Sequence, residues 1–297
     1  MNKLSGIIPP LVTPVHSDGR LDVESLQKLI DNCINEGVNG IFIMGSCGEG
    51  SVLGAELRAD ITREAVKIVA GRVALLVGVL ESSTQKVIEE IKRLEPLGAE
   101  YFVVTPPFYL PAANQDQIYA HFKDIAASTK KNIVAYNIPC FVNSEILPET
   151  QQKICAIENV VGVKDSTGNW DLFQKALMLK KQNDFTLISG DESLASAGMI
   201  FGSNGCVPCL GNPYPRMLVD LYEAAQRKDI DGVFALETKL VQTKRTWGCG
   251  GYWIAIVKYL CARKGLCQPY TLTPSLDLTD EQKRFIDELL DVEEVAY

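Results

Sequence analysis

The sequence predicts an α/β protein with the architecture of a (β/α)8 barrel, a TIM barrel, followed by additional C-terminal helices. Short apolar runs rich in β-branched residues alternate with segments of helical hydrophobic period along most of the chain. Eight such pairs fill about 230 residues, and a repeat of about 28 residues suits a parallel strand with its crossover helix. Polar and Gly-rich stretches recur just after the apolar runs, where a barrel carries its chemistry.

Each strand is predicted from a brief apolar run bounded by turn residues. The strands are expected over residues 6–13, 40–44, 73–79, 101–105, 133–136, 160–164, 185–189 and 206–210. The first helix illustrates the helical pattern, because its apolar side chains share one face between Asp22 as N-cap and Gly37 beyond its end. The helices are expected over residues 23–36, 56–70, 84–97, 115–127, 148–157, 170–181, 193–201 and 215–227.

The segment from residue 230 onward has a purely helical pattern. Helices are expected there over residues 234–244, 252–264 and 279–290. No linker rich in Pro, Gly or Ser separates this segment from the barrel. We therefore divide the chain into a barrel, residues 1–229, and a helical extension, residues 230–297, packed on it.

Composition narrows the possible functions. The chain has 297 residues and a net charge of -8, which argues against a nucleic-acid partner. No apolar stretch reaches membrane-spanning length, and the first residues lack the apolar core of a signal peptide. Nine cysteines, an odd number, favour reduced thiols in a cytoplasm. Because the two histidines lie far apart in sequence, we expect no His-rich metal site.

Lys164 is the most informative residue. It ends the predicted sixth strand, at the C-terminal lip of the barrel. Lys is almost never fully buried without compensation, and burial disfavours the charged form of an amine. A neutral amine on a rigid strand end is a nucleophile toward carbonyl carbon. We hypothesise that Lys164 forms a Schiff base with a keto substrate; alternatively, its side chain reaches solvent and only caps the barrel.

Other strand ends offer groups that suit such chemistry. Backbone N–H groups in the turn Gly45-Ser-Cys-Gly-Glu-Gly50 can bind a substrate carboxylate, or its glycines can serve the turn alone. Tyr136 ends the fifth strand, where its phenol can transfer protons during imine formation, or it can be a core tyrosine with a satisfied hydroxyl. Tyr109, after the fourth strand, has the same two interpretations.

Two further groups of residues have open interpretations. Asp191 and Glu192 follow the seventh strand, where they can bind substrate hydroxyls or serve as a loop carboxylate and a first-turn acid of the next helix. Cys206 and Cys209 form a single C-x-x-C within the predicted eighth strand. Without a second pair, neither a zinc site nor a redox site is well supported.

Six motifs, in order along the chain, resemble those of the dihydrodipicolinate synthase / N-acetylneuraminate lyase family, whose members are Schiff-base, pyruvate-handling barrel enzymes. They cover nearly the whole barrel. They are Gly6-Ile-Ile-Pro-Pro-Leu-Val-Thr-Pro14, Gly45-Ser-Cys-Gly-Glu49, Val104-Thr-Pro-Pro-Phe-Tyr109, Tyr136-Asn-Ile-Pro139, Gly162-Val-Lys-Asp-Ser-Thr167 and Ser189-Gly-Asp-Glu192.

The resemblance implies roles for the matching residues. Lys164 is similar to the imine-forming lysine, and Tyr136 to the proton-shuttling tyrosine. Ser46 matches a relay hydroxyl, and Cys47 stands where threonine is usual, so its backbone amide alone carries over to carboxylate binding. Tyr109 is similar, within one residue of register, to a relay tyrosine that crosses from a neighbouring subunit in some members. The substrate-binding residues are expected to be Ser46, Cys47, Gly190, Asp191, Glu192 and Val207.

Two departures from the family pattern bear on the substrate. The lysine-pathway synthases usually carry an arginine where this chain has Phe141, and a phenyl ring cannot pair with a carboxylate. Sialic-acid lyases usually follow the lysine with an aromatic residue, where this chain has Asp165. Sugar-acid aldolases and dehydratases of the family tolerate more variation at both positions.

We therefore predict a class I aldolase, a lyase, that cleaves a 2-keto-3-deoxy sugar acid or a sialic-acid-like substrate to pyruvate and an aldehyde. The lysine imine would require no metal or organic cofactor. The enzyme alternatives are dihydrodipicolinate synthase, which condenses pyruvate with aspartate semialdehyde, and a sugar-acid dehydratase. The non-enzyme alternative is a barrel that binds a keto acid without turnover. The resemblance also implies a homotetramer built as a dimer of dimers.

Overall fold

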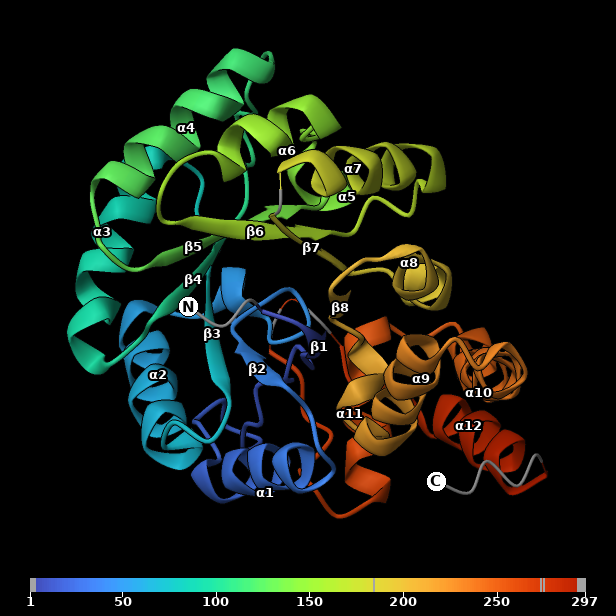
Figure 1. Ribbon diagram of the computed structural model, residues 1–297. Coiled ribbons are helices and arrows are strands. Elements are labelled where there is room, and N and C mark those ends of the chain that lie inside the picture. Colours follow the sequence, from blue (N-terminus) through green and yellow to red (C-terminus); the bar gives the residue numbers. More distant parts are fainter. Residues whose placement is uncertain (1–3, 184, 273, 275, 293–297) are drawn as a thin grey trace.

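Eight parallel strands form a barrel around which the helices are arranged (Figure 1). The computed structural model describes residues 4–183, 185–272, 274 and 276–292. The strands within these residues are β1 (Gly6–Ile7), β2 (Gly40–Ile43), β3 (Ala74–Val79), β4 (Tyr101–Val104), β5 (Asn132–Asn137), β6 (Val160–Asp165), β7 (Thr186–Ser189) and β8 (Gly205–Cys206). The predicted (β/α)8 class and the order of its elements are confirmed.

The helices follow the strands in the predicted alternation. The α-helices of the barrel are α1 (Val23–Asn35), α2 (Ala55–Val69), α3 (Thr84–Leu94), α4 (Gln115–Ala127), α5 (Pro139–Val142), α6 (Pro148–Cys155), α7 (Trp170–Asn183), α8 (Ala195–Phe201) and α9 (Pro215–Arg227). Single 3-10 turns are η1 (Gly50–Val52), η2 (Glu95–Leu97), η3 (Glu192–Leu194) and η4 (Cys209–Gly211). Asp22 caps α1 as predicted, because its side chain accepts a hydrogen bond from the Ser25 N–H.

The barrel closes through its shortest strands. β1 pairs with β8, whereas β1 and β2 are joined through a single bridge between Pro10 and Phe42. The prediction of a first strand over residues 6–13 was therefore wrong in length. The physical reason is that Pro9 and Pro10 have no N–H group to donate to a ladder.

The predicted eighth strand, residues 206–210, was also too long. β8 ends at Cys206, and Cys209 begins η4, so the two cysteines of the C-x-x-C do not share a strand. Pro208, between them, cannot donate a ladder hydrogen bond. The pattern also missed the short helix α5, which begins with Pro139 directly after β5.

Side chains alternate between two apolar layers. One cluster fills the space between strands and helices and includes Val163. A smaller cluster fills the barrel interior and includes Phe42, Val134 and Tyr136. Because successive strand residues point to opposite faces, Lys164 follows Val163 on the interior side. The end of β6 thus directs the Lys164 side chain into the barrel, and in this way the fold positions its site.

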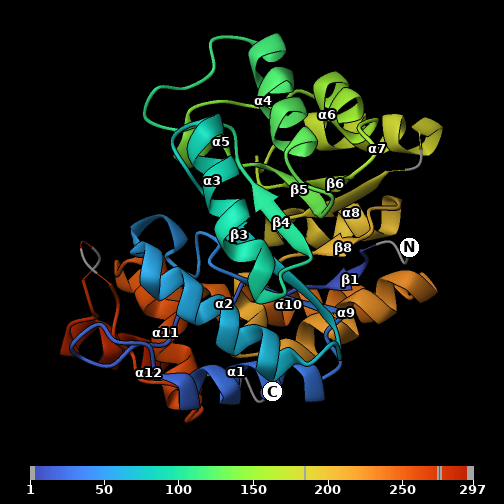
Figure 2. The ribbon, with the colours of Figure 1, turned by 90° about the vertical axis from the view of Figure 1, so that its left-hand side faces the viewer.

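The C-terminal extension consists of α10 (Ile230–Lys244), η5 (Arg245–Cys249), α11 (Trp253–Arg263) and α12 (Asp280–Val292). In Figures 1 and 2 it lies in the half of the molecule that also holds α1, α2 and α9. α10 begins four residues before the predicted start at 234, where Asp229 accepts a hydrogen bond from the Gly232 N–H. The domain boundary at residues 229–230 remains a prediction, since α9 and α10 pack against each other. Across the described residues, no helix combines the length and apolarity needed to cross a membrane.

Candidate active site

Lys164 lies near the end of β6, directly opposite Tyr136 in β5. Only 5% of Lys164 is exposed, so the alternative in which its side chain extends into solvent does not describe this residue. Its Nζ lies 3.9 Å from the centre of the Tyr136 ring and 5.0 Å from that of Phe42. Within the described part of the chain, no carboxylate lies within ion-pair distance of this nitrogen. The amine is therefore dry and surrounded by aromatic rings rather than by counter-charges.

A hydrogen-bonded network on the outer side of the same strands holds these two residues in register. Asp165, next to Lys164, accepts hydrogen bonds from Asn137 Nδ2 at 2.8 Å and Gln151 Nε2 at 3.0 Å. Its other oxygen accepts from the N–H of Thr167 at 3.1 Å and from the hydroxyl of Thr167 at 2.7 Å. Buried carboxylates persist in proteins when hydrogen bonds satisfy them. Asp165 thus fixes the strand end from outside the barrel.

The turn after β2 is tight and leaves backbone donors unused. Met44 and Glu49 both have positive φ, 56° and 57°. A Cβ at Gly50 would fall within the backbone of Met44, so only glycine fits there. Among the described residues, the N–H groups of Ser46 and Cys47 donate to no acceptor of the protein. Unpaired amides at such a turn can bind an anion, which favours that interpretation over a plain turn.

One cavity of about 260 Å³ brings most of the predicted residues together. The predicted site residues that line it are Lys164, Tyr136, Ser46, Cys47, Gly190, Asp191, Glu192 and Val207. Their arrangement at the carboxyl ends of the strands agrees with the position of active sites in barrels of this kind. Their individual roles remain predictions.

Tyr109 is the predicted residue that lies outside this cavity. It is 90% exposed and has a φ of 70° in the loop after β4. The residue before it, Phe108, lines a neighbouring cavity instead. Within this one chain, Tyr109 therefore reaches neither Lys164 nor Tyr136.

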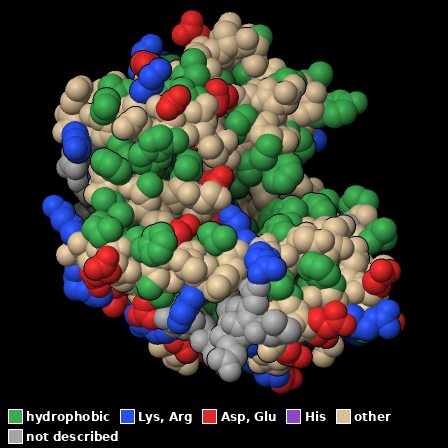
Figure 3. All heavy atoms as spheres, turned by 90° about the vertical axis from the view of Figure 1, so that its right-hand side faces the viewer, with side chains coloured by type: hydrophobic (Ala, Val, Ile, Leu, Met, Phe, Trp, Pro, Cys, Tyr) green, Lys and Arg blue, Asp and Glu red, His purple; other side chains and the backbone are tan. Residues whose placement is uncertain are grey.

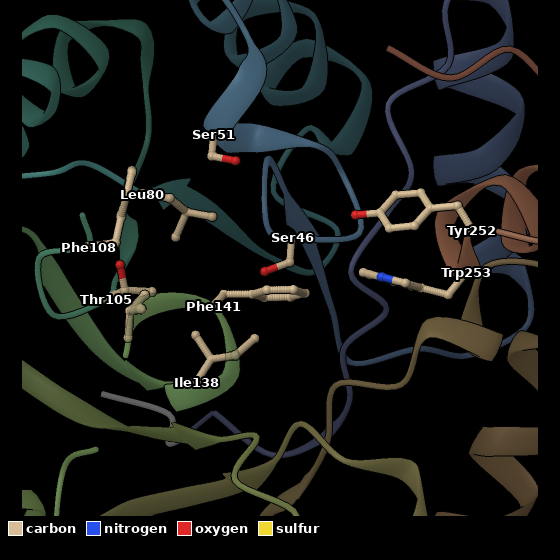
Figure 4. A pocket seen from close by; sticks show the side chains of 10 residues that line it. Ser46, Ser51, Leu80, Thr105, Phe108, Ile138, Phe141, Tyr252 and Trp253 are labelled. Atoms are coloured by element: carbon tan, nitrogen blue, oxygen red, sulfur yellow. The ribbon is translucent and has the colours of Figure 1, made fainter. Parts of the chain in front are cut away.

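The neighbouring cavity has a volume of about 230 Å³ and is apolar with a few hydroxyls. Figure 4 shows the Phe141 ring close to Ser46, with the rings of Tyr252 and Trp253 directed toward them from the opposite side. Ser46, Phe141 and Trp253 line both cavities, so the two spaces adjoin. Thr105 lines this second cavity, and its buried hydroxyl has no hydrogen-bond partner among the described residues.

Several lining residues were missed by reading strand ends alone. Ser166, two residues after Lys164, lines the first cavity, and its buried hydroxyl has no partner in the described part of the chain. Lys244, Trp247 and Trp253 come from the C-terminal extension. No strand precedes them, so the barrel rule gave no reason to inspect them. The one available signal was the unusual density of tryptophan and glycine between residues 247 and 253.

Asp191 and Glu192 fulfil local structural roles while lining the cavity. Asp191 caps η3 by accepting a hydrogen bond from the Ser193 N–H at 2.7 Å. Glu192 accepts from the Leu210 N–H at 2.7 Å, and burial raises the pKa of its carboxyl. The geometry is therefore compatible both with binding of substrate hydroxyls and with a purely structural role for these two residues.

Cys47, which lines the cavity, and Cys206 in β8 are suited to packing rather than to nucleophilic attack. A hydrogen bond with Cys209 and burial raise the pKa of the Cys47 thiol well above its usual range. Burial does the same to the pKa of Cys206. The thiolate is the reactive form of cysteine, so these groups are weak nucleophiles near neutral pH. The described residues contain no cluster of three or more His, Cys, Asp or Glu side chains arranged to hold a metal ion.

Comparison with known proteins matches residues 3–292 to the model of the Dihydrodipicolinate synthetase family. The chain is 32% identical over 243 residues to a 4-hydroxy-tetrahydrodipicolinate synthase of Pseudomonas savastanoi pv. phaseolicola, which covers 82% of each chain. It is 30% identical over 294 residues to a protein of Escherichia coli strain K12 named "Probable 2-dehydro-3-deoxy-D-pentonate aldolase YjhH", covering 98% of this chain and 97% of that one.

Two solved structures share nearly the whole fold. YagE from E. coli K12, a member of the dihydrodipicolinic acid synthase family in complex with pyruvate, superposes with a TM-score of 0.93 at 26% identity, covering 98% of this chain and 99% of that one. Dihydrodipicolinate synthase from Bacteroides thetaiotaomicron gives a TM-score of 0.93 at 30% identity, covering 98% and 100%.

Proposed function

This chain belongs to the dihydrodipicolinate synthetase family, and from that premise we propose that it is a pyruvate-dependent class I aldolase working through an imine on Lys164. The resemblance inferred from the motifs is thereby confirmed, and the chain is an enzyme. One observation carries the proposal: Lys164 is buried, with no counter-charge from the described residues, in a cavity shared with Tyr136 and the Gly-rich turn.

The proposed mechanism begins with attack of neutral Lys164 Nζ on the C2 carbonyl of a 2-keto acid. Loss of water gives a protonated imine, which withdraws electrons from the C3–C4 bond. Tyr136, with Ser46 as a relay hydroxyl, removes the proton of the C4 hydroxyl, and the bond breaks to release an aldehyde. The enamine takes a proton at C3, and water hydrolyses the imine to pyruvate and free Lys164. The amides of Ser46 and Cys47 would bind the substrate carboxylate, and we propose no metal or organic cofactor.

Borohydride reduction tests the imine directly. The protein is incubated with pyruvate, reduced with borohydride and digested. The mass of the peptide that contains Lys164 is then measured by mass spectrometry. We expect a mass increase corresponding to reduced pyruvate on this peptide alone. An unmodified Lys164 peptide, with or without label elsewhere, contradicts the proposal.

The proposed substrate is a 2-keto-3-deoxy sugar acid. Phe141 lines the cavity in place of an arginine that would bind a second carboxylate, and YjhH, named as a pentonate aldolase, is similar over nearly the whole chain. Dihydrodipicolinate synthesis is the second candidate, favoured by the names of several relatives. A sugar-acid dehydratase would use the same imine. We expect pyruvate release to be fastest with ketodeoxy sugar acids; faster turnover of pyruvate with aspartate semialdehyde would overturn this choice.

We also propose that the chain acts as a cytoplasmic homotetramer, a dimer of dimers, in which Tyr109 enters the site of a second copy. Tyr109 and Leu110 are both strongly exposed, and the cavity lined by Phe108 and Thr105 is open beside Ser46. Figure 3 displays the side of α7, α8 and α10, where hydrophobic side chains gather on both sides of a hollow. The exposed large hydrophobic residues of these helices are Met178, Phe201, Ile230, Phe234 and Val241. Light scattering of the purified chain tests the assembly.

A further inference from the structure

A fully buried ion pair joins the Gly-rich turn to the C-terminal extension. Lys258, in the middle of α11, has no exposed surface, and its Nζ lies 2.5 Å from Glu49 Oε2. The same nitrogen donates a hydrogen bond to the Tyr270 carbonyl at 2.7 Å. The other oxygen of Glu49 accepts from the Leu272 N–H at 2.7 Å. The Glu49 carboxylate is thus bound by two parts of the extension.

Glu49 belongs to the turn that supplies the unpaired amides. It follows Ser46 and Cys47 closely, and its N–H donates to the Ser46 carbonyl at 3.1 Å. Its φ of 57° lies in the left-handed region, which a non-glycine residue keeps only when its surroundings fix it. Its side chain is directed away from the cavity, which it does not line. Glu49 therefore shapes the turn through its backbone while the extension holds its side chain.

The pair also has an electrostatic consequence. A buried carboxylate without a partner, so close in sequence to amides that receive an anion, would repel that anion strongly in a low-dielectric interior. Lys258 neutralises Glu49 and removes this repulsion. An apolar residue at position 49 would avoid the repulsion too, but it could not accept the hydrogen bond from Leu272.

We propose that Glu49 and Lys258 are positioning residues that shape and neutralise the carboxylate-binding turn, so that the C-terminal extension is required for binding of the keto-acid carboxylate. This inference rests on the proposed function of the turn. It assigns to α11 a role in substrate binding, although α11 follows none of the barrel strands.

The test measures how the borohydride trapping of Lys164 depends on pyruvate concentration in the full chain. In Lys258→Met, the unpaired Glu49 carboxylate is expected to raise the half-saturating concentration by about tenfold or more, with trapping at saturation preserved. In Glu49→Gln/Lys258→Met, which has no charge and keeps an acceptor for Leu272, we expect most of this loss to be recovered. Such a rescue distinguishes charge at the turn from general destabilisation.

Tyr259→Phe is the matched control. Tyr259 lies next to Lys258 on α11, but its hydroxyl donates to Asp287 of α12, at 2.9 Å from Oδ2. Removal of this hydroxyl should lower the unfolding temperature and leave the pyruvate dependence unchanged. If Lys258→Met matches Tyr259→Phe in pyruvate dependence, the inference is wrong. If Lys258→Met does not fold, Glu49→Gln is compared with the double variant instead. Glu49→Gln keeps the Lys258 cation without its carboxylate, so its half-saturating pyruvate concentration should be lower than that of the double variant. Failure of the unaltered chain to trap pyruvate would instead refute the proposed function.

Discussion

The carboxyl end of β6 and the middle of α11 each hold a buried lysine, and their surroundings are opposite. Lys258 pairs with a carboxylate and a backbone carbonyl. Lys164 lies against two aromatic rings, with no carboxylate within ion-pair distance among the described residues. Both side chains are removed from water, so burial alone does not distinguish a reactive lysine from a structural one.

The difference lies in whether other groups of the protein already bind the nitrogen. Lys258 Nζ is held by the Glu49 carboxylate and the Tyr270 carbonyl. Lys164 Nζ has no such partner among the described residues and lines the cavity, where a substrate carbonyl can reach it. Lys258 is therefore suited to hold the Gly-rich turn, and Lys164 to react. The same substitution at the two positions should separate these roles.

Lys164→Met should have the largest effect on activity. We expect turnover and borohydride trapping to fall by about 10⁴-fold or more, because Lys244, the other lysine that lines the cavity, donates to the Ser193 hydroxyl and does not lie beside Tyr136. The midpoint of thermal unfolding should stay the same or rise, because an unpaired buried amine is replaced by an apolar side chain of similar volume. A variant that keeps activity, or that loses much stability, would contradict the contrast with Lys258.

Lys258→Met should have the largest effect on stability. Removing one partner of a buried ion pair costs about 3–5 kcal/mol, because the remaining charge is left without compensation. Urea unfolding followed by circular dichroism measures this loss, and Lys164→Met is its matched control. Glu49→Gln/Lys258→Met should recover part of the free energy of unfolding. Equal stability of the two single variants would mean that the pair contributes little.

The same contrast explains what the sequence could and could not predict. Lys164 ends an apolar strand, so its position at the barrel mouth followed from the strand pattern. Lys258 is the one charge in the interior of the apolar helix Trp253–Arg263, which carries its other charge on its last residue; this signal was available and was not used. Its partner Glu49 is over 200 residues away, and helical periodicity carries no information about contacts at that distance. The predictions were accurate where local pattern decides and incomplete where tertiary contacts decide.

The short strands and the extension illustrate the same limit. Apolar residues 8–13 and 207–210 look like strand, but the prolines among them lack the N–H groups that a ladder needs. Tyr109 ends a recognisable motif, yet a one-residue difference in register places Phe108 at the neighbouring cavity. Trp247 in η5 and Trp253 at the start of α11 line the cavity, although neither element follows a strand of the barrel. Each error concerns hydrogen-bond donors or long-range packing, which apolar periodicity does not encode.

Tyr136→Phe should sharpen the assignment of roles around Lys164. Loss of the phenol is expected to reduce turnover by about 10²–10³-fold, as is usual for removal of a general acid–base group. Pyruvate should still be trapped on Lys164, but at a lower rate. The amine keeps its position because the phenyl ring still packs against it. Tyr101→Phe is the control, because Tyr101 begins β4 at the opposite end of the barrel. Equal turnover in both variants would show that the Tyr136 hydroxyl takes no part in the reaction.

His121 is a third buried basic side chain, and among the described residues no carboxylate lies within ion-pair distance of its ring. Its Nε2 lies 3.1 Å from the Thr105 carbonyl and its Nδ1 2.9 Å from the Thr84 hydroxyl, an arrangement that suits the neutral ring.

Burial lowers the pKa of His121 to about 4 from 6.5. Above pH 6.5 the ring is neutral in both folded and unfolded chains, so it contributes its full stability there. As the pH falls toward 4, only the unfolded chain binds the proton, and we expect about 3 kcal/mol of stability to be lost over this interval. Urea unfolding at a series of pH values measures the slope, and His121→Gln should flatten it. An unchanged slope in that variant would show that other groups cause the acid sensitivity, and that burial alone does not hold a basic side chain neutral in this barrel.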